Sequence, residues 1–189
     1  MSGDKTTITV DRDVALRCSK LARELGMSFQ KLASDALRIV EEVVKDGGSP
    51  MDLLYTWRGI KSMSATDTIA LPMTILLKFF EDLQPGKFAP DFYEAGREIG
   101  IAMSHEITFA DLVKRPLIFK ILLPLRSANS RETEREIIFT LAIPPYSKRL
   151  TPLLSAYIRG LLDAYGYTQH KIEVKEHIIE VIVYKSAQT

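Results

Sequence analysis

The chain has 189 residues, 25 lysines and arginines against 24 acidic residues, and 46% apolar side chains, which is the composition of an ordinary soluble globular protein. The length allows one large domain or two small ones, and a net charge of +1 excludes a strongly basic or acidic protein. The longest apolar run, residues 117–125, is too short for a bilayer, and the polar N-terminus is unlike a signal peptide, so we expect no membrane association. The single cysteine, Cys18, cannot form an internal disulfide and fits a reducing cytoplasm.

A short run of alternating residues near the N-terminus, Thr-Thr-Ile-Thr-Val, predicts a β-strand. Ile8 and Val10 share one face of this strand, and the other face carries Lys5, Thr7 and Thr9. No partner strand follows nearby, so we expect the same strand of a second copy to pair with it.

Two amphipathic helices follow the strand. Asp11 and Asp13 supply capping and first-turn charge for the first helix, whose apolar stripe is Val14, Cys18, Leu21, Ala22 and Leu25. Gly26 is suited to close that helix, and Ser28 to cap the next. The second helix has an inner face of Leu32, Ala33, Ala36, Leu37, Val40, Val43 and Val44, and it ends at Gly47-Gly48.

This order of strand, helix and helix, with Gly-x-Ser between the helices, resembles the ribbon-helix-helix family of DNA-binding proteins. The resemblance implies that two chains form an antiparallel ribbon in the major groove of double-stranded DNA, with Lys5, Thr7 and Thr9 as the reading side chains. It also implies that a backbone phosphate sits at Ser28-Phe29, near Lys31. A helical hairpin, or a dimerisation unit that never meets DNA, remains the alternative.

Charge in this segment is balanced, because residues 1–48 hold eight basic and eight acidic side chains. Nucleic-acid binders usually carry a basic excess. Attraction would therefore be local, from Lys5, the chain amine, Arg12 and Lys31, each doubled in a dimer. We expect modest affinity that depends on two-fold or higher-order binding.

A domain boundary is predicted where two glycines precede a serine and a proline, Gly47-Gly48-Ser49-Pro50. We therefore assign residues 1–47 to a DNA-binding and dimerisation domain and residues 50–189 to a second domain. In the first half of this second domain we expect a short helix over 51–58, an extended stretch at 69–71 and a helix over 74–83 that is broken at 85–86. A further helix is predicted over 91–107, followed by a kinked or broken helix over 109–125 and a loop over 126–133. Gly96 and Gly100, four residues apart, predict close approach of another backbone.

The second half of this domain changes to the period-two pattern of strands. Ile137, Phe139, Leu141 and Ile143 share one strand face, a helix is predicted from Thr151 to a stop at Gly166, and residues 171–174 and 178–184 predict a hairpin turning near Glu176-His177. The fold class expected for the whole chain is α+β, with an N-terminal ribbon-helix-helix followed by helices packed on an antiparallel sheet.

Two motifs of this domain, FYEAGREIGIAM at 92–103 and YIRGLLDAYGY at 157–167, are similar to the 4-vinyl reductase domain. They are more distantly similar to the haem-NO-binding and TRAPP proteins of the same fold. The resemblance implies a dimeric module that often encloses a small apolar ligand. Family members commonly carry a cysteine cluster near the final strands; this chain has none there, so we expect no metal or other cofactor.

Catalytic patterns are weak. Glu132, Glu134 and Glu136 alternate on a strand edge, as solvated residues do, and no phosphate loop or nucleophile elbow occurs. The sequence contains three histidines. His170 and His177 could meet across a hairpin as metal ligands, or His105 could be an axial ligand of haem. Ordinary surface histidines are the simpler interpretation. Aromatic residues favour a core, or a pocket for an apolar effector between helices and sheet: Phe79, Phe80, Phe92, Tyr93, Phe109, Phe119, Tyr157 and Tyr165.

The sequence therefore predicts a homodimeric transcriptional regulator that is not an enzyme. Its C-terminal domain would dimerise and sense a small apolar ligand, with pairing of dimers into tetramers left open. The alternatives are an oligomerisation or small-molecule-binding protein that does not bind DNA and, with least support, an enzyme acting on a small apolar substrate.

Overall fold

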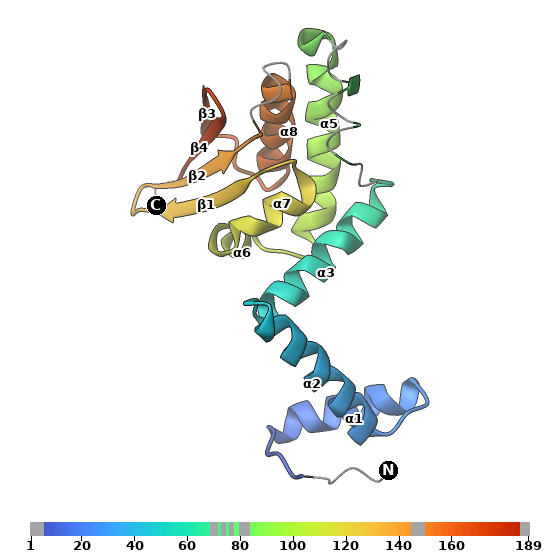
Figure 1. Ribbon diagram of the computed structural model, residues 1–189. Helices are drawn as coiled ribbons and strands as arrows, with labels where there is room; N and C mark the ends of the chain where they lie inside the picture. Colours follow the sequence, from blue (N-terminus) through green and yellow to red (C-terminus); the bar gives the residue numbers. More distant parts are fainter. Residues whose placement is uncertain are drawn as a thin grey trace. The chain divides into compact units, whose positions relative to one another are not determined.

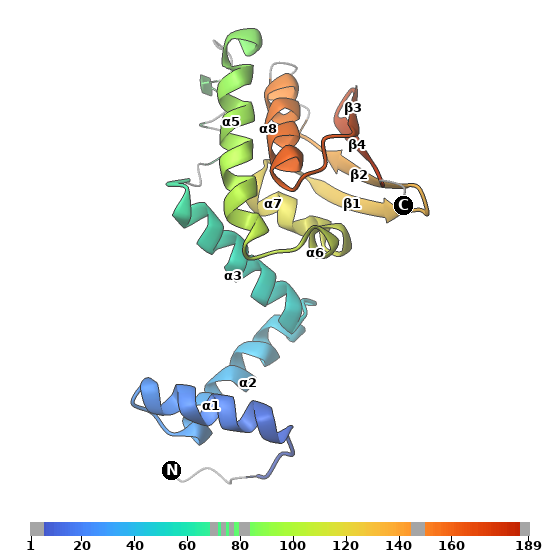
Figure 2. The ribbon, with the colours of Figure 1, turned by 180° about the vertical axis from the view of Figure 1, so that it is seen from behind.

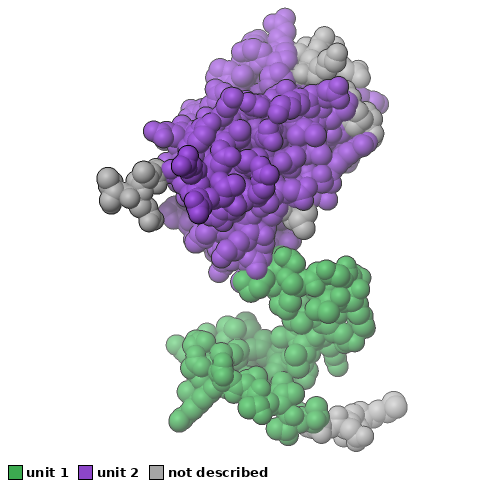
Figure 3. Space-filling view, turned by 90° about the vertical axis from the view of Figure 1, so that its left-hand side faces the viewer, with its two compact units in different colours: residues 1–53 green, residues 54–189 purple. Residues whose placement is uncertain are grey.

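The computed structural model describes residues 6–68, 72, 75, 78, 79, 84–144 and 150–185. The chain divides into two compact units, residues 1–53 and 54–189 (Figure 3). The division falls within helix α3 (Pro50–Ala65), shortly after the pair of glycines that the sequence singled out.

The first unit consists of helices α1 (Arg12–Glu24) and α2 (Phe29–Lys45) (Figure 1). Gly26 closes α1 with a φ of 69°, and Gly47 follows α2 with a φ of 80°, the left-handed conformation that glycine adopts without a steric penalty. Ser28 caps α2, because its hydroxyl accepts the N–H of Lys31 at 3.1 Å. These predicted helix ends are confirmed, except that the side chain of Asp11 makes no capping bond at the start of α1.

The predicted N-terminal strand is not formed within the single chain. Residues 6–10 have no strand hydrogen bonds and are exposed, and Lys5 lies outside the described residues. The physical reason is that a strand is held by bonds to a neighbouring strand, and the described part of the first unit contains only helices besides this segment. A ribbon-helix-helix unit is therefore not shown, and only the helical pair is.

Helix α3 is longer than the helix predicted over 51–58. It continues to Ala65. The additional turns were not predicted because the buried side of the helix, Tyr55, Gly59 and Ser62, shows no apolar pattern. Ser49 caps this helix as expected, since its hydroxyl accepts the N–H of Asp52 at 3.2 Å.

The remaining helices of the second unit surround its core. Helix α5 (Pro85–Ser104) begins earlier than predicted, with Pro85 in its first turn, where proline is tolerated. The end of the helix predicted before it lies outside the described residues. The predicted broken helix is confirmed as α6 (Phe109–Lys114), a 3-10 turn η1 (Pro116–Ile118) and α7 (Phe119–Leu122). The extended stretch predicted at 69–71 lies outside the described residues, and of the helix predicted over 74–83 only Ile75, Lys78 and Phe79 are described, all helical.

Four antiparallel strands form one sheet in the order β1-β2-β4-β3. The loop predicted over 126–133 is wrong, because β1 (Ser127–Glu132) pairs with β2 (Glu136–Ala142), with Ala128 opposite Leu141. The predicted hairpin is confirmed as β3 (His170–Lys175) and β4 (Ile178–Tyr184), with Glu176 at a φ of 50° in the turn. The α+β class, with helices packed on an antiparallel sheet, is confirmed.

Helices α5 and α8 (Leu150–Ala164) lie side by side, as both ribbon views show (Figures 1 and 2). A Cβ built on Gly96 would lie 2.0 Å from the carbonyl oxygen of Tyr157, and one built on Gly160 would lie 2.0 Å from the carbonyl oxygen of Tyr93. Because no side chain fits between these backbones, the close approach predicted from the glycine spacing is confirmed. The core beneath contains Phe119, Phe139, Leu153, Leu161 and Val181, all almost fully buried.

Candidate functional site

The side chains predicted to read DNA lie on the exposed N-terminal segment. Thr7 and Thr9 are exposed, and so are their apolar neighbours Ile8 and Val10. Within the described residues, no hydrogen bond or ion pair joins Thr7 or Thr9 to Ser28, the other predicted contact.

The start of α2 has the geometry of an anion site. Ser28 uses its hydroxyl for the N–H of Lys31 and its carbonyl for the N–H of Leu32, at 3.1 Å each. In the part of the chain that is described, no group accepts the N–H of Phe29 or Gln30. Two free donors at the positive end of a 17-residue helix favour a phosphate or carboxylate oxygen.

Several charged side chains of α1 and α2 are paired within their own helix. The Lys31 ammonium lies 3.1 Å from Asp35, one turn along α2, and Arg17 lies 2.7 Å from Asp13. Such exposed pairs contribute little, so a phosphate can replace the carboxylate beside Lys31 at small cost. Arg12 makes no ion pair with any described residue and is the cation left available at the start of α1.

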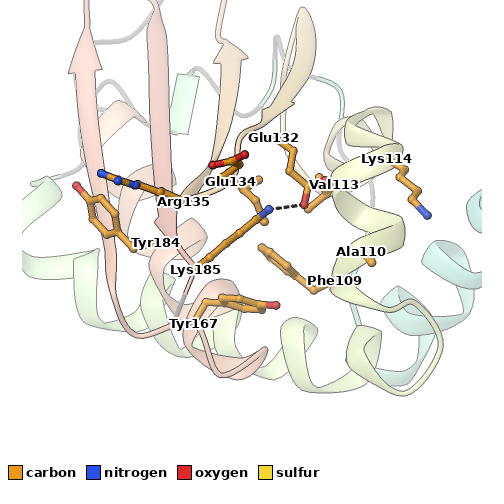
Figure 4. A pocket seen from close by; sticks show the side chains of 11 residues that line it. Phe109, Ala110, Val113, Lys114, Glu132, Glu134, Arg135, Tyr167, Tyr184 and Lys185 are labelled. Carbon is orange, nitrogen blue, oxygen red and sulfur yellow. Dashed lines mark ion pairs between the residues drawn. The ribbon is translucent and has the colours of Figure 1, made fainter. Parts of the chain in front are cut away.

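A groove of about 1020 Å³ lies in the second unit, between α6 and one end of the sheet (Figure 4). The rings of Phe109 and Tyr167 stack there, with centroids 3.9 Å apart. Lys185 reaches across to Glu132 at 2.8 Å and donates to the carbonyl of Thr133 at 2.7 Å. The remaining lining residues are Ala110, Val113, Lys114, Glu134, Arg135, Ile137 and Tyr184.

This groove differs from the apolar pocket that the aromatic residues predicted. Of those eight residues Phe80 lies outside the described part of the chain, and among the other seven only Phe109 lines the groove, whereas Phe119 is buried in the core. Four separate segments supply the lining, which includes the charged side chains Lys114, Glu132, Glu134, Arg135 and Lys185. No local pattern in the sequence could have found it, because the segments meet only when the sheet closes against α6.

A polar cluster fixes α3 against α6. Asp111 accepts from the hydroxyl of Thr108 at 2.6 Å and also from the hydroxyl of Tyr55, and these two bonds hold the pKa of its carboxyl below the usual range. The Arg115 guanidinium lies 4.7 Å from the centre of the Tyr55 ring. Nearby, Lys61 pairs with Glu106, which lowers the pKa of that carboxyl as well.

The histidines are not assembled into a metal site. His170 begins β3 and His177 lies in the turn at its other end, so the hairpin separates them instead of joining them. His170 Nδ1 is 2.8 Å from the carbonyl oxygen of Tyr167, and His105 is exposed at the end of α5. Among the described residues, no group of three ligating side chains could hold a metal ion.

Neither protein-family models nor the curated proteins contain a match to this sequence. Over the described ranges, no helix has both the length and the apolar character that crossing a bilayer requires. The function therefore has to be inferred from the geometry of the two units.

Proposed function

We propose that the protein is a homodimeric DNA-binding transcriptional regulator. In this proposal residues 6–10 of two copies pair as an antiparallel ribbon, which places Thr7 and Thr9, with Lys5, on the side that enters the major groove. Ile8 and Val10 then face the two helix pairs, and a phosphate of the DNA backbone meets the start of α2 at Ser28-Phe29, beside Lys31.

The observation that carries this proposal is the near absence of a core in the first unit. Among residues 6–53 only Ala22 is buried, whereas many large apolar side chains of the same unit are exposed. They are Ile8, Val10, Val14, Leu16, Leu21, Leu25, Phe29, Leu37, Ile39 and Val44, followed by Met51 and Leu53. A unit of about 50 residues without a core does not fold by itself.

A second copy supplies the missing core. Burying the exposed half of a leucine or valine contributes on the order of 1 kcal/mol, so covering most of these side chains provides the stabilisation that the single unit lacks. Ile8 and Val10 belong to the same apolar set, which is why the ribbon and the helices are expected to assemble together. In the paired strand the alternation places Thr7 and Thr9 on the face away from this apolar set. Their hydroxyl and methyl groups can contact base edges there.

Binding is expected to be modest in affinity and sensitive to salt. The first 48 residues carry eight basic and eight acidic side chains, so attraction to phosphates comes from a few local groups and is doubled by the two-fold axis. The second unit is proposed to dimerise and to respond to a small apolar effector. An effector alters DNA affinity only if it binds one placement of the two ribbons better than another.

Gel retention with matched variants tests the proposal. The triple variant Lys5→Ala, Thr7→Ala and Thr9→Ala should keep the dimer mass and lose specific retention by at least about tenfold, since several base and phosphate contacts disappear. Lys20→Ala, on an exposed position of α1, is the matched loss of one charge and should leave retention nearly unchanged. A dimer in which the triple variant retains DNA as the wild type does would leave the first unit as an assembly device only.

A further inference from the structure

The groove beside α6 has two neighbouring cations on its sheet side. The last opposed residues in the pairing of β2 with β4 are Glu136 and Tyr184. The next position along both strands holds Arg135 and Lys185, whose backbones are joined by a hydrogen bond of 2.9 Å from the N–H of Lys185 to the carbonyl oxygen of Arg135. Directly opposed residues carry their side chains on the same face of a sheet. Both cations line the groove, together with Ile137, whose side chain belongs to the core.

Only one of these two cations is compensated. Like charges in opposed positions repel each other. The Lys185 ammonium lies 2.8 Å from the Glu132 carboxylate and donates to the carbonyl oxygen of Thr133 at 2.7 Å. Among the described residues, no carboxylate or other acceptor is bonded to the Arg135 guanidinium. The whole lining contains three basic and two acidic side chains, so a ligand with a single negative charge would balance it.

The floor of the groove is aromatic. The ring of Phe109 stacks on Tyr167 with centroids 3.9 Å apart and meets Phe139 of the core edge to face. Phe109 is buried, whereas Tyr167 is half-buried and offers ring surface to the groove. Figure 4 shows the two stacked rings and the Lys185 side chain bordering the same space. Rings held in this way form a fixed platform for a further aromatic ring.

We propose that this groove binds a small aromatic carboxylate. The ring of the ligand packs against Tyr167 and Phe109, and its carboxylate accepts hydrogen bonds from Arg135 and Lys185. A guanidinium presents two parallel N–H donors to a carboxylate, which makes such a contact stronger than one between neutral groups. The groove volume of about 1020 Å³ lies at the upper end of the range for small-molecule sites, so one or two rings enter without movement of the backbone. A doubly charged phosphate fits less well, because the lining has an excess of only one positive charge.

This site is independent of the first unit. All its residues belong to the second unit, so binding requires neither dimerisation through residues 6–10 nor contact with DNA. The ligand carries a charge and is therefore distinct from the apolar effector of the proposed regulator.

Calorimetric titration of the full-length protein with three probes tests the assignment. Benzoate has both the ring and the charge, benzamide keeps the ring without the charge, and cyclohexanecarboxylate keeps the charge without the aromatic ring. The wild type should bind benzoate at least about tenfold more tightly than benzamide, because the charge-assisted hydrogen bonds are lost in the amide. It should bind benzoate about threefold more tightly than cyclohexanecarboxylate, because only benzoate offers a ring for stacking.

Arg135→Gln and Arg131→Gln are the matched variants. The guanidinium of Arg135 is bonded to no described residue, so its replacement removes the anion contact without breaking an ion pair of the fold. Arg131 is exposed on β1 opposite Ile138 and does not line the groove. Arg135→Gln should weaken benzoate binding at least about tenfold and leave benzamide binding nearly unchanged, whereas Arg131→Gln should alter neither.

The remaining outcomes overturn the assignment. They are a wild type that does not bind benzoate, equal binding of benzoate and benzamide, and equal effects of the two arginine variants. If Arg135→Gln does not fold by circular dichroism, the NMR signals of the Phe109 and Tyr167 rings in the wild type decide the question. Shifts of these signals on addition of benzoate support the site, and unchanged signals overturn it.

Gel retention of DNA by the same samples separates this inference from the proposed function. Retention of DNA without binding of benzoate overturns the groove assignment alone. Binding of benzoate without retention of DNA supports the groove assignment and counts against the proposed function alone.

Discussion

The contact between α5 and α8 gives the sharpest prediction about stability. A methyl group at Gly96 would meet the carbonyl oxygen of Tyr157, and one at Gly160 would meet the carbonyl oxygen of Tyr93, each at 2.0 Å. Real Cβ atoms essentially never approach closer than 3.0 Å, so the two backbones must separate by at least about 1 Å. Gly96→Ala or Gly160→Ala therefore disturbs the whole length of the helix contact.

The loss of stability in these variants depends on whether the atoms that the added methyl group meets can move away. Overpacking costs about 1–3 kcal/mol where neighbouring side chains can move to make room. At Gly96 and Gly160 the neighbouring atoms are backbone atoms, which cannot move in this way. Each variant should therefore lose about 3 kcal/mol or more of unfolding free energy. For a protein of this size that corresponds to a decrease in Tm of roughly 10 °C. Both clashes are relieved by the same separation, so the double variant should cost less than the sum of the two single variants.

Circular dichroism during heating and urea titration measures these changes. Gly86→Ala, in the first turn of α5, is the matched control, because nothing lies within 4 Å of the added methyl group. It should be neutral or stabilise by up to about 1 kcal/mol, since alanine restricts the unfolded chain. Equal stability of Gly96→Ala and Gly86→Ala would refute the close approach of the two helices.

Two further predictions concern Ser28 and Asp111. Ser28→Ala should lose about 1 kcal/mol of stability and weaken DNA retention, whereas Ser34→Ala, within α2, should do neither; an unchanged Tm for both would argue against the cap. The pKa of Asp111 is lowered by the hydroxyls of Thr108 and Tyr55, so its ionised form stabilises the fold above its ordinary pKa and this contribution disappears as the pH falls through the lowered value. The Tm difference between wild type and Asp111→Asn should accordingly be largest near pH 7 and shrink below about pH 4, and a difference that stays constant to pH 3 would contradict the assignment.

Local signals in the sequence were sufficient for the C-terminal ends of α1 and α2, for the start of α2 and for the glycine contact. Gly26, Ser28 and Gly47 act through their own backbone conformation or hydrogen bonds, which neighbouring residues determine. Gly96 was recognisable because small residues on one helical stripe have a direct steric consequence. These features need no knowledge of distant parts of the chain.

Features that depend on distant segments were missed. Strand β1 is polar and was predicted as a loop, because an edge strand derives its order from β2 and from the bond of Ser130 to the carbonyl of Val113. The full length of α3 was not predictable because its buried side, Tyr55, Gly59 and Ser62, contains no run of apolar residues at helical spacing. The groove beside α6 draws on four segments, so its residues could not be grouped in advance.

Selection of bound sequences from a randomised duplex pool tests the central claim most directly. The wild type should enrich an inverted repeat, because two ribbon strands related by a two-fold axis read two equivalent half-sites. The variant that replaces Lys5, Thr7 and Thr9 by alanine should enrich nothing while remaining dimeric. A wild-type dimer that enriches no common sequence would contradict the account.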